Sequence, residues 1–424
     1  MSPLVLLALL SSPASAHDLA IRHATVLTAA GAPLLDGTVI VHDGVIAAVG
    51  ASVATGTVPA VTIPTGADSI DATGMYLMPG IIDPHSHMGD YSWPDGVGHN
   101  DGNEATEPFT PRIWAGDSID LEDPAFPLAR AGGVTTVQVL PGSANLIGGR
   151  SAVIKLRPRR TLDEMLFKAA PPGIKMAIGE NPKRVYTGER GEETDIQIQT
   201  RMGEFAALRR EFQAALDYRE ARKRPAAQGG PPPRDLDLDV ILDILDGKIL
   251  VHLHCYETND ILGMYRIADQ YGFHIQSLQH GLEAYKIRDV VKAHGTMLAT
   301  FTDWWGFKIE AWDAIPQNAV LATQDGIPVS IHSDSASFVQ RLNIEAAKML
   351  RYGWTEDDAL KSITLWPAMM LGVQSHVGTI EVGKDADLAL YDKDPFSVYS
   401  RCQRTWIDGE QVYDRATTPV GGAL

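Results

Sequence analysis

Two histidines follow an apolar run near residue 80, where residues 79–87 read PGIIDPHSH. In an extended strand, side chains two positions apart point to the same face. His85 and His87 would therefore present two imidazoles side by side, and imidazole nitrogens are common ligands of divalent metal ions. The spacing predicts a metal site at the end of this strand, rather than two unrelated loop histidines.

Further candidate ligands end later apolar runs. Residues 278–281 read LQHG, which places His280 just before a glycine where the chain must turn. Residues 331–334 read IHSD, which places Asp334 at the end of another run. A histidine packed in the core and an aspartate that caps a helix are the alternative explanations. Because both residues come at strand ends, as the first pair does, we expect them to reach the same site.

A second pair of histidines two residues apart occurs in residues 251–257, which read VHLHCYE. Both His252 and His254 would face the interior if this segment is a strand. The later histidine lies nearer the carboxyl end of the strand, where the other candidates gather. We therefore predict His254 as the ligand, and keep His252, one layer below it, as the alternative.

The elements that must position these residues alternate between strands and helices. Eight apolar strand candidates lie near residues 76–82, 134–140, 151–156, 173–178, 248–254, 273–279, 296–301 and 327–333. Strands that alternate with helices pair in parallel through crossovers, so eight units in roughly 300 residues predict a (β/α)8 barrel. The alternative, a doubly wound open sheet, would favour a glycine-rich phosphate-binding turn after the first strand, and the sequence has none there.

Short β-segments also occur toward both ends of the chain. Asp43-Gly44 separates two alternating apolar runs, and Asp408-Gly409 separates two more. This pattern is typical of hairpins. It predicts one small β-domain built from both ends.

On these motifs the chain resembles the amidohydrolase superfamily of metal-dependent hydrolases, and it is most similar to the imidazolonepropionase-like and prolidase-like branch. The resemblance also includes GVTTV at residues 133–137 and VGTIEVGKDADL at residues 377–388. It implies an α/β fold in which a barrel domain of residues 75–371 is joined to a β-sandwich domain of residues 17–74 and 372–415.

The resemblance further implies a set of metal ligands: two histidines, a bridging lysine or glutamate, two later histidines and an aspartate. In this chain the corresponding residues are His85, His87, Lys175, His254, His280 and Asp334. The aspartate would also act as the general base.

The bridging position has two candidates, because residues 173–180 read GIKMAIGE. The Ile-Lys-x-Ala pattern resembles family members whose lysine is carboxylated by CO2 and bridges two metals. A buried lysine beside two cations loses its proton readily, as carbamate formation requires. We prefer Lys175, and keep Glu180 as the alternative because it already carries a carboxylate and lies later on the strand.

Loops at the carboxyl ends of the strands must select the substrate. Candidates near predicted strand ends are Tyr256, His332, Lys183, Arg184 and Trp304. Lys183 and Arg184 could hold a substrate carboxylate, whereas Trp304 could wall an apolar pocket. His332 would face inward beside Asp334 and either orient it or pack there.

Together these residues predict a hydrolase that binds zinc, and the number of ligands favours two ions. Metal-bound water would ionise near neutral pH and attack the carbonyl of an amide, in a dipeptide or a cyclic amide. Three alternatives stay open: a mononuclear deaminase, a lactonase or esterase, and a non-catalytic metal-binding barrel. We expect a small-molecule substrate, and a homo-oligomer remains open.

The net charge and the first residues bear on partners and location. The chain has 36 Lys and Arg against 53 Asp and Glu, a net charge of −17, which argues against a nucleic-acid partner. Residues 4–10 are apolar but too few to span a bilayer, and Ala14-Ser15-Ala16 fits a cleavage site. Residues 1–16 are therefore expected to be a signal peptide, with a periplasmic or secreted mature protein. No later stretch predicts a membrane span.

The two cysteines, Cys255 and Cys402, exclude a disulfide scaffold and a cysteine zinc cluster. We expect both to be small buried side chains. A single bridge between them stays formally open.

Overall fold

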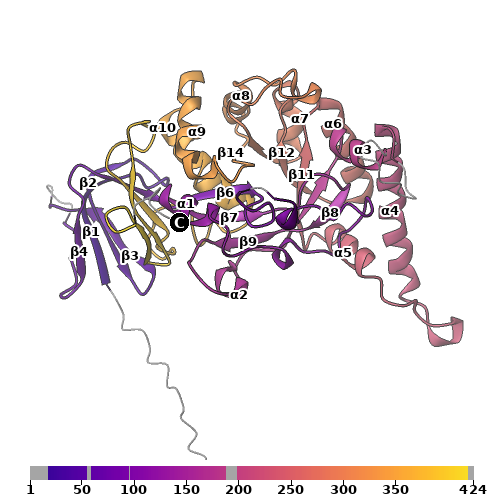
Figure 1. Ribbon diagram of the computed structural model, residues 1–424, viewed down its shortest axis with the longest axis horizontal. Helices are drawn as coiled ribbons and strands as arrows, with labels where there is room; N and C mark the ends of the chain where they lie inside the picture. Colours follow the sequence, from indigo (N-terminus) through magenta and orange to yellow (C-terminus); the bar gives the residue numbers. More distant parts are fainter. Residues whose placement is uncertain (1–17, 55–58, 95, 188–197, 419–424) are drawn as a thin grey trace, which may run out of the picture.

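The computed structural model describes residues 18–54, 59–94, 96–187 and 198–418. The predicted signal peptide of residues 1–16 lies outside these ranges and stays a prediction. The molecule has a β-sheet unit at one side and a larger α/β unit at the other (Figure 1).

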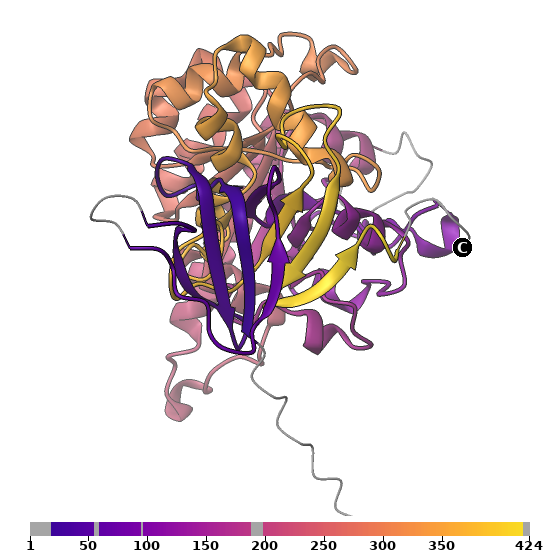
Figure 2. The same ribbon diagram turned by 90° about the vertical axis from the view of Figure 1, so that its left-hand side faces the viewer.

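The first unit is one eight-stranded sheet that contains strands from both ends of the chain. Strands β1 to β5 come from the amino-terminal part, and β15 to β17 from the carboxyl-terminal part (Figure 2). Their bounds are Asp18–Val26, Leu34–His42, Val45–Ala51, Asp68–Asp71 and Tyr76–Pro79, then Leu388–Tyr391, Cys402–Ile407 and Glu410–Asp414. The strand order is β17-β16-β15-β5-β1-β2-β3, with β4 beside β1. We call this unit the terminal sheet.

The predicted strand of residues 76–82 is divided between the two units. Its first part, β5, pairs with β1 and β15 of the terminal sheet, whereas β6 (Ile81–Ser86) belongs to the α/β unit. Gly80 stands between them, and a β-carbon there would collide with the side chain of Thr135. The chain therefore passes from one unit to the other at Gly80.

Two sheets form the centre of the α/β unit. One has the order β14-β13-β12-β11-β10-β8 and the other β6-β7-β9. The bounds of β7 to β14 are Val134–Val139, Ile147–Arg150, Ala152–Lys155, Gly173–Ala177, Leu250–Cys255, Ile275–His280, Met297–Thr300 and Val329–Ile331. Only Ser151 separates β8 from β9, so the two sheets share one bent strand.

The sequence predicts parallel pairing for the third strand, near residues 151–156, and this prediction is wrong. The segment that contains β8 and β9 runs antiparallel to both of its neighbours, β10 and β7. Only residues 140–146 separate β7 from β8. A parallel connection needs about a dozen residues or more, so the chain must turn back here.

The two sheets also meet at their other ends. Beyond the end of β14, the Asp334 N–H donates to the carbonyl of His85 at 3.1 Å. The Ser333 hydroxyl donates to the buried Asp83 carboxylate at 2.5 Å. These bonds bring the end of β14 beside the end of β6, and so bring Asp334 to the histidine pair.

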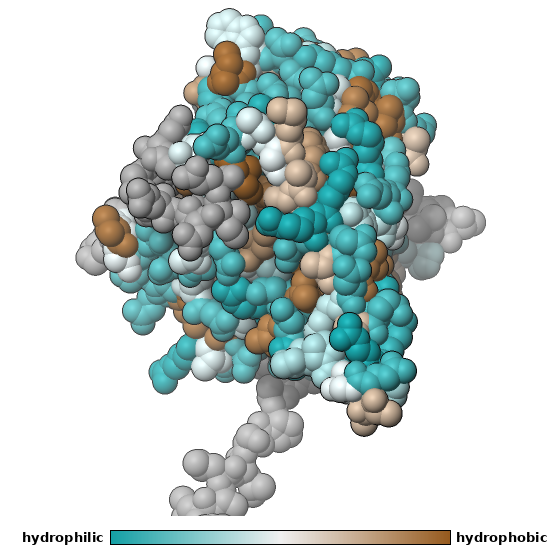
Figure 3. Space-filling view, turned by 90° about the vertical axis from the view of Figure 1, so that its right-hand side faces the viewer, coloured by the Kyte–Doolittle hydropathy of each residue, from teal (hydrophilic) through white to brown (hydrophobic). Residues whose placement is uncertain are grey.

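Helices surround the strands of the α/β unit (Figure 1). Helices α1 to α11 are Ala125–Ala131, Leu162–Met165, Glu180–Tyr186, Arg201–Ala221, Leu236–Leu245, Thr258–Tyr271, Arg288–Ala293, Asn318–Gln324, Leu342–Lys348, Glu356–Ser362 and Leu365–Met370. The side chain of Thr200 caps α4 by accepting the Gly203 N–H, and Asp235 caps α5 in the same way. On the face of the molecule that points away from the terminal sheet, hydrophilic side chains dominate the surface and apolar ones are scattered (Figure 3).

Both cysteines are buried and free, as the sequence predicts, with Cys255 on β11 and Cys402 on β16. Within the described ranges, each helix is too short or too polar to traverse a lipid bilayer.

Candidate functional site

A cleft of about 380 Å3 opens at the carboxyl ends of the central strands, where most of the predicted ligands converge. The residues that line it are His87, Tyr91, Asn103, Gly142, Ser143, Ala144, Asn181, Arg184, Val185, His254, Tyr256, His280 and Asp334. His85 lies beneath His87 and is fully buried.

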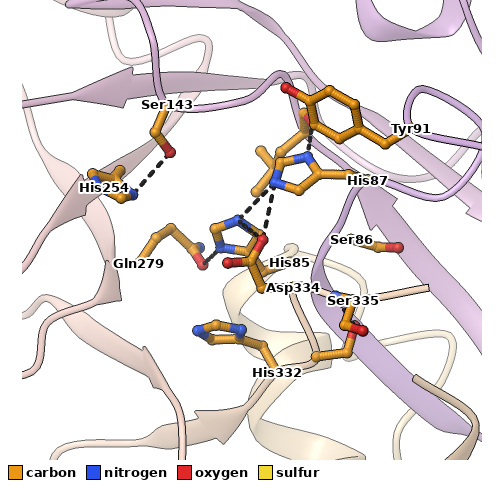
Figure 4. A network of polar contacts seen from close by, with 12 residues as sticks. His85, Ser86, His87, Tyr91, Ser143, His254, Gln279, His332, Asp334 and Ser335 are labelled. Atoms are coloured by element: carbon orange, nitrogen blue, oxygen red, sulfur yellow. Dashed lines mark hydrogen bonds and ion pairs between the residues drawn. The ribbon is translucent and has the colours of Figure 1, made fainter. Parts of the chain in front are cut away.

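The two histidines of the first pair turn the same ring nitrogen toward each other (Figure 4). Their Nε2 atoms are 3.3 Å apart. His85 Nδ1 lies 2.8 Å from Gln279 Oε1, and His87 Nδ1 lies 2.6 Å from the carbonyl of Leu140. Both oxygens only accept hydrogen bonds, so each Nδ1 carries the proton and each Nε2 is left with a bare lone pair.

Asp334 completes this group from the opposite side. Its Oδ1 lies 3.1 Å from His87 Nε2 and 3.6 Å from His85 Nε2. The residue has a φ of 47°, a backbone conformation that is uncommon for residues other than glycine. Such local strain is typical of functional sites.

Lys175 reaches the same group from one layer below. Its backbone on β10 is in register with His252 of β11, yet its long side chain places Nζ 3.5 Å from His85 Nε2. Nζ also donates to the carbonyl of Pro141 at 3.2 Å. The side chain is fully buried, and burial lowers the pKa of the amine to about 8. More of this amine is therefore neutral near neutral pH than in an exposed lysine.

The two histidines of the second pair lie in different layers. His254 lines the cleft, with Nδ1 2.8 Å from the Ser143 hydroxyl and Nε2 accepting from the Asn181 amide at 3.3 Å. His252 is fully buried below it and contacts the Ser277 hydroxyl at 2.8 Å.

His280 and His332 form a pair of their own at the floor of the cleft. His280 Nδ1 lies 3.2 Å from His332 Nε2, and His280 has a φ of 74°. The ring of Tyr256 stacks on His280 at 5.1 Å, with Phe301 4.9 Å from the same imidazole. Trp304 stacks on Phe301 at 4.4 Å, so it lies behind the cleft wall and outside the lining residues.

The remaining predicted residues follow β10. Glu180 begins α3 and pairs with Arg184 at 3.2 Å, and no contact between Glu180 and the histidines is present in the described residues. Arg184 lines the cleft, whereas Lys183 lies outside the lining.

The structure adds residues that the sequence analysis missed. Gln279 accepts from His85 and donates to Ser277 at 2.9 Å, so a buried hydrogen-bonded chain connects His85 to His252. Lys308 donates to Asn181 at 3.0 Å and lies 4.1 Å from the centre of the Tyr256 ring. The Gln279 position directly before His280 is the only local hint in the sequence, because the other contacts join distant segments.

The donor atoms suit a divalent cation. Two bare imidazole nitrogens face each other at 3.3 Å beside a carboxylate, an arrangement that concentrates electron density with no hydrogen between the nitrogens. His85 belongs to two groups whose ligand atoms lie within 4.8 Å of one another, one with His87 and Asp334 and one with His280 and His332. Nitrogen and carboxylate ligands in this mixture suit zinc and related ions.

Comparison with known proteins identifies the family. A family model described as Amidohydrolase family matches residues 306–413. The solved structure of an amidohydrolase from Thermotoga maritima MSB8 is 35% identical, with a TM-score of 0.85 over 94% of this chain and 100% of that chain. The chain belongs to the amidohydrolase family. It is therefore a hydrolase that acts on carbon–nitrogen bonds, and the sequence prediction of this class is confirmed.

Curated relatives of this amidohydrolase have different lengths. Amidohydrolase tasK of Hapsidospora irregularis is 32% identical over 89% of this chain, and the chain spans only 40% of tasK. An imidazolonepropionase of Caulobacter vibrioides is 26% identical over 85% of this chain and 90% of its own length. A prolidase structure from Bifidobacterium longum has a TM-score of 0.58 at 17% identity, which shows a shared fold alone.

Proposed function

We propose that this amidohydrolase uses divalent metal ions to hydrolyse an amide bond of a small molecule, on a (β/α)8 barrel whose third strand is reversed. The observation that carries the proposal is the pair of bare Nε2 atoms of His85 and His87, held 3.3 Å apart beside Asp334. A cation between them would remove the repulsion between their lone pairs.

The proposed ligands divide into two groups around a bridge. His85, His87 and Asp334 would hold one ion, while His254 and His280 would hold a second, most suitably zinc. A carboxylated Lys175 would bridge them, formed when the neutral amine attacks CO2 and loses a proton. When bound, the metal ions would polarise the substrate carbonyl and favour the ionised form of water.

The residues of the chain would handle the proton and the substrate. Asp334 is ionised at neutral pH and lies at the cleft, so it can accept a proton from water and return it to the leaving nitrogen. Tyr256 and Arg184 line the cleft and would position the substrate. Arg184 shares its charge with Glu180, which leaves hydrogen-bond donors for a substrate carboxylate.

The choice of Lys175 over Glu180 as the bridge rests on their surroundings. Lys175 is fully buried and its Nζ touches the histidine group. Glu180 instead contacts Arg184 at the start of α3. The structure therefore supports the preferred assignment by position, and the carbamate itself is the part to be tested.

Substitution of the two candidates is the decisive experiment. We expect about two zinc-like ions per chain by elemental analysis of the wild type. Lys175→Ala should lose metal and most activity, and native mass spectrometry should show one CO2 more on the wild type. Glu180→Gln should keep its metal, with activity losses of about 10–100-fold or less. A metal-loaded, active Lys175→Ala enzyme would rule out the bridge.

The substrate class can be narrowed by a screen. Relatives named imidazolonepropionase and a fold neighbour named prolidase point to cyclic amides and to dipeptides. Acyl dipeptides, Xaa-Pro dipeptides, cyclic amides and lactones should be offered to metal-loaded protein. Release of an amine or opening of a cyclic amide supports the proposal. Release of ammonia, or cleavage of lactones only, would favour a deaminase or a lactonase instead.

A further inference from the structure

A second cavity, of about 430 Å3, lies away from the cleft, where the terminal sheet meets the α/β unit. Its walls come from the end of α1, from the start of α9 with the 3-10 turn Val339–Arg341, and from the segment that connects β15 to β16. No residue lines both this cavity and the cleft. We call it the junction cavity.

The junction cavity has an unbalanced charge. Arg341, Arg401 and Arg415 line it, and no Asp or Glu is among its lining residues. A comparable cavity of about 460 Å3 elsewhere at the junction is lined by four Lys or Arg and by four Asp or Glu. In a chain whose net charge is −17, a carboxylate-free cavity with three guanidinium groups is a marked departure.

The three guanidinium groups have no carboxylate partner among the described residues. Within the described part of the chain, no ion pair joins any of the three to an acidic side chain within 4.0 Å. Arg401 donates its Nη1 to the carbonyls of Val398 and Ser400, at 3.0 and 2.8 Å. The neighbouring Asp392 accepts from the Arg401 N–H and from Gln403.

The floor of the junction cavity is already formed. Tyr391 is buried and donates its hydroxyl to the carbonyl of Gly132 at 2.6 Å, which ties the terminal sheet to α1. Asn343 is buried and donates to the carbonyl of Pro395 at 2.6 Å. The arginines therefore stand around a fixed floor, so binding would cost little rearrangement of the backbone.

We propose that the junction cavity binds a small anion that carries two or more carboxylate or phosphate groups. Guanidinium groups pair with both kinds of oxyanion through two parallel hydrogen bonds. Three of them exceed what one such group requires, which favours a ligand with several charges. The volume suits a small metabolite. This site stands apart from the proposed catalytic function, so either can fail without the other.

Calorimetric titration of the full chain tests the proposal. Succinate serves as the dicarboxylate and fructose 1,6-bisphosphate as the diphosphate, each at about 0.15 M salt to screen weak surface attraction. We expect saturable binding of one molecule per chain for at least one probe, and the probe that binds identifies the kind of anion. Absence of saturable binding for both would overturn the proposal.

Matched substitutions locate the binding. Arg401→Gln and, separately, Arg415→Gln should each weaken binding by about tenfold or more. Arg159→Gln, in the balanced cavity, should leave the affinity unchanged. If the probes instead bind metal in the cleft, the heat of binding will be the same in all variants. Equal heats in all variants would therefore overturn the proposal. The proposal would also be overturned if the arginine substitutions changed the oligomeric state in the absence of any anion, because the cavity would then be an interface between copies of the chain.

Discussion

The amide of Gln279 decides which ring nitrogen of His85 carries the proton. Its oxygen accepts from Nδ1, and its nitrogen is held in place by Ser277. Groups that orient a metal-binding histidine in this way commonly affect the affinity for the metal. We therefore expect Gln279→Leu to weaken metal binding by about 10–100-fold while the fold is retained.

Competition with a coloured chelator measures this affinity. Gln276→Leu is the matched control, because Gln276 lies on the same strand but contacts the carbonyls of Met369 and Met370. Equal metal affinity in the two variants would show that Gln279 has no orienting role.

The sequence could predict candidate ligands but only part of their surroundings. His85 and His87 are found from a local spacing, and so is the layering of His254 above His252. Gln279 meets His85 across 194 residues of sequence, and no local pattern encodes such a contact. The tautomers follow from these distant partners, so they required the structure.

At the scale of elements, the alternation of strands and helices predicted most of the central strands correctly. The third strand failed because the strand pattern is the same for parallel and antiparallel pairing. The deciding signal was the short connection of residues 140–146, which leaves no room for a crossover. The division at Gly80 could not be predicted for a similar reason, because two short strands separated by a single residue have the same sequence pattern as one longer strand.

Helix α4 supports the turn that precedes α3 through a buried acid. Glu204 accepts from the Gly179 N–H at 3.3 Å, and burial raises the pKa of its carboxyl to about 8. Between pH of about 4.5 and about 8, the folded chain keeps a proton that the unfolded chain has lost. The contribution of Glu204 to stability is therefore greatest at low pH and is lost as the pH rises through this range.

Urea unfolding at several pH values checks this expectation. The unfolding free energy of Glu204→Gln minus that of the wild type should increase as the pH rises from about 4.5 to about 8. Above about pH 8 this difference should stay constant. Glu220→Gln, on an exposed part of the same helix, should follow the wild type throughout. A difference independent of pH would contradict the assignment.

At the scale of the whole molecule, one lysine joins the two units. Lys155 of β9 is buried, and its Nζ contacts Asp385, Asp387 and Asp408 at 2.7, 3.1 and 2.5 Å. Burial lowers the pKa of this amine, but the three carboxylates outweigh it and raise the pKa above its usual value. The lysine therefore stays charged while it holds the carboxylates of the terminal sheet.

Lys155→Met should destabilise the protein by about 3–5 kcal/mol, because it leaves the buried Asp387 without its cation. The unfolding free energy in urea measures the loss. Arg159→Gln removes a more exposed pair with Glu410 and should cost less than about 1 kcal/mol. Equal stability of the two variants would mean that the buried cluster contributes nothing to the junction.

The mixed origin of the terminal sheet has a consequence for biosynthesis. Strand β5 pairs with β15 on one side, yet β15 leaves the ribosome only after the entire α/β unit has been made. Until then β5 is an open edge, and open edges of sheets attract other strands. A chain that stalls before residue 388 would carry this edge permanently. During synthesis, a holding chaperone that covers this edge would therefore prevent it from pairing with other strands. The need for the chaperone ends only when the final strands have been added.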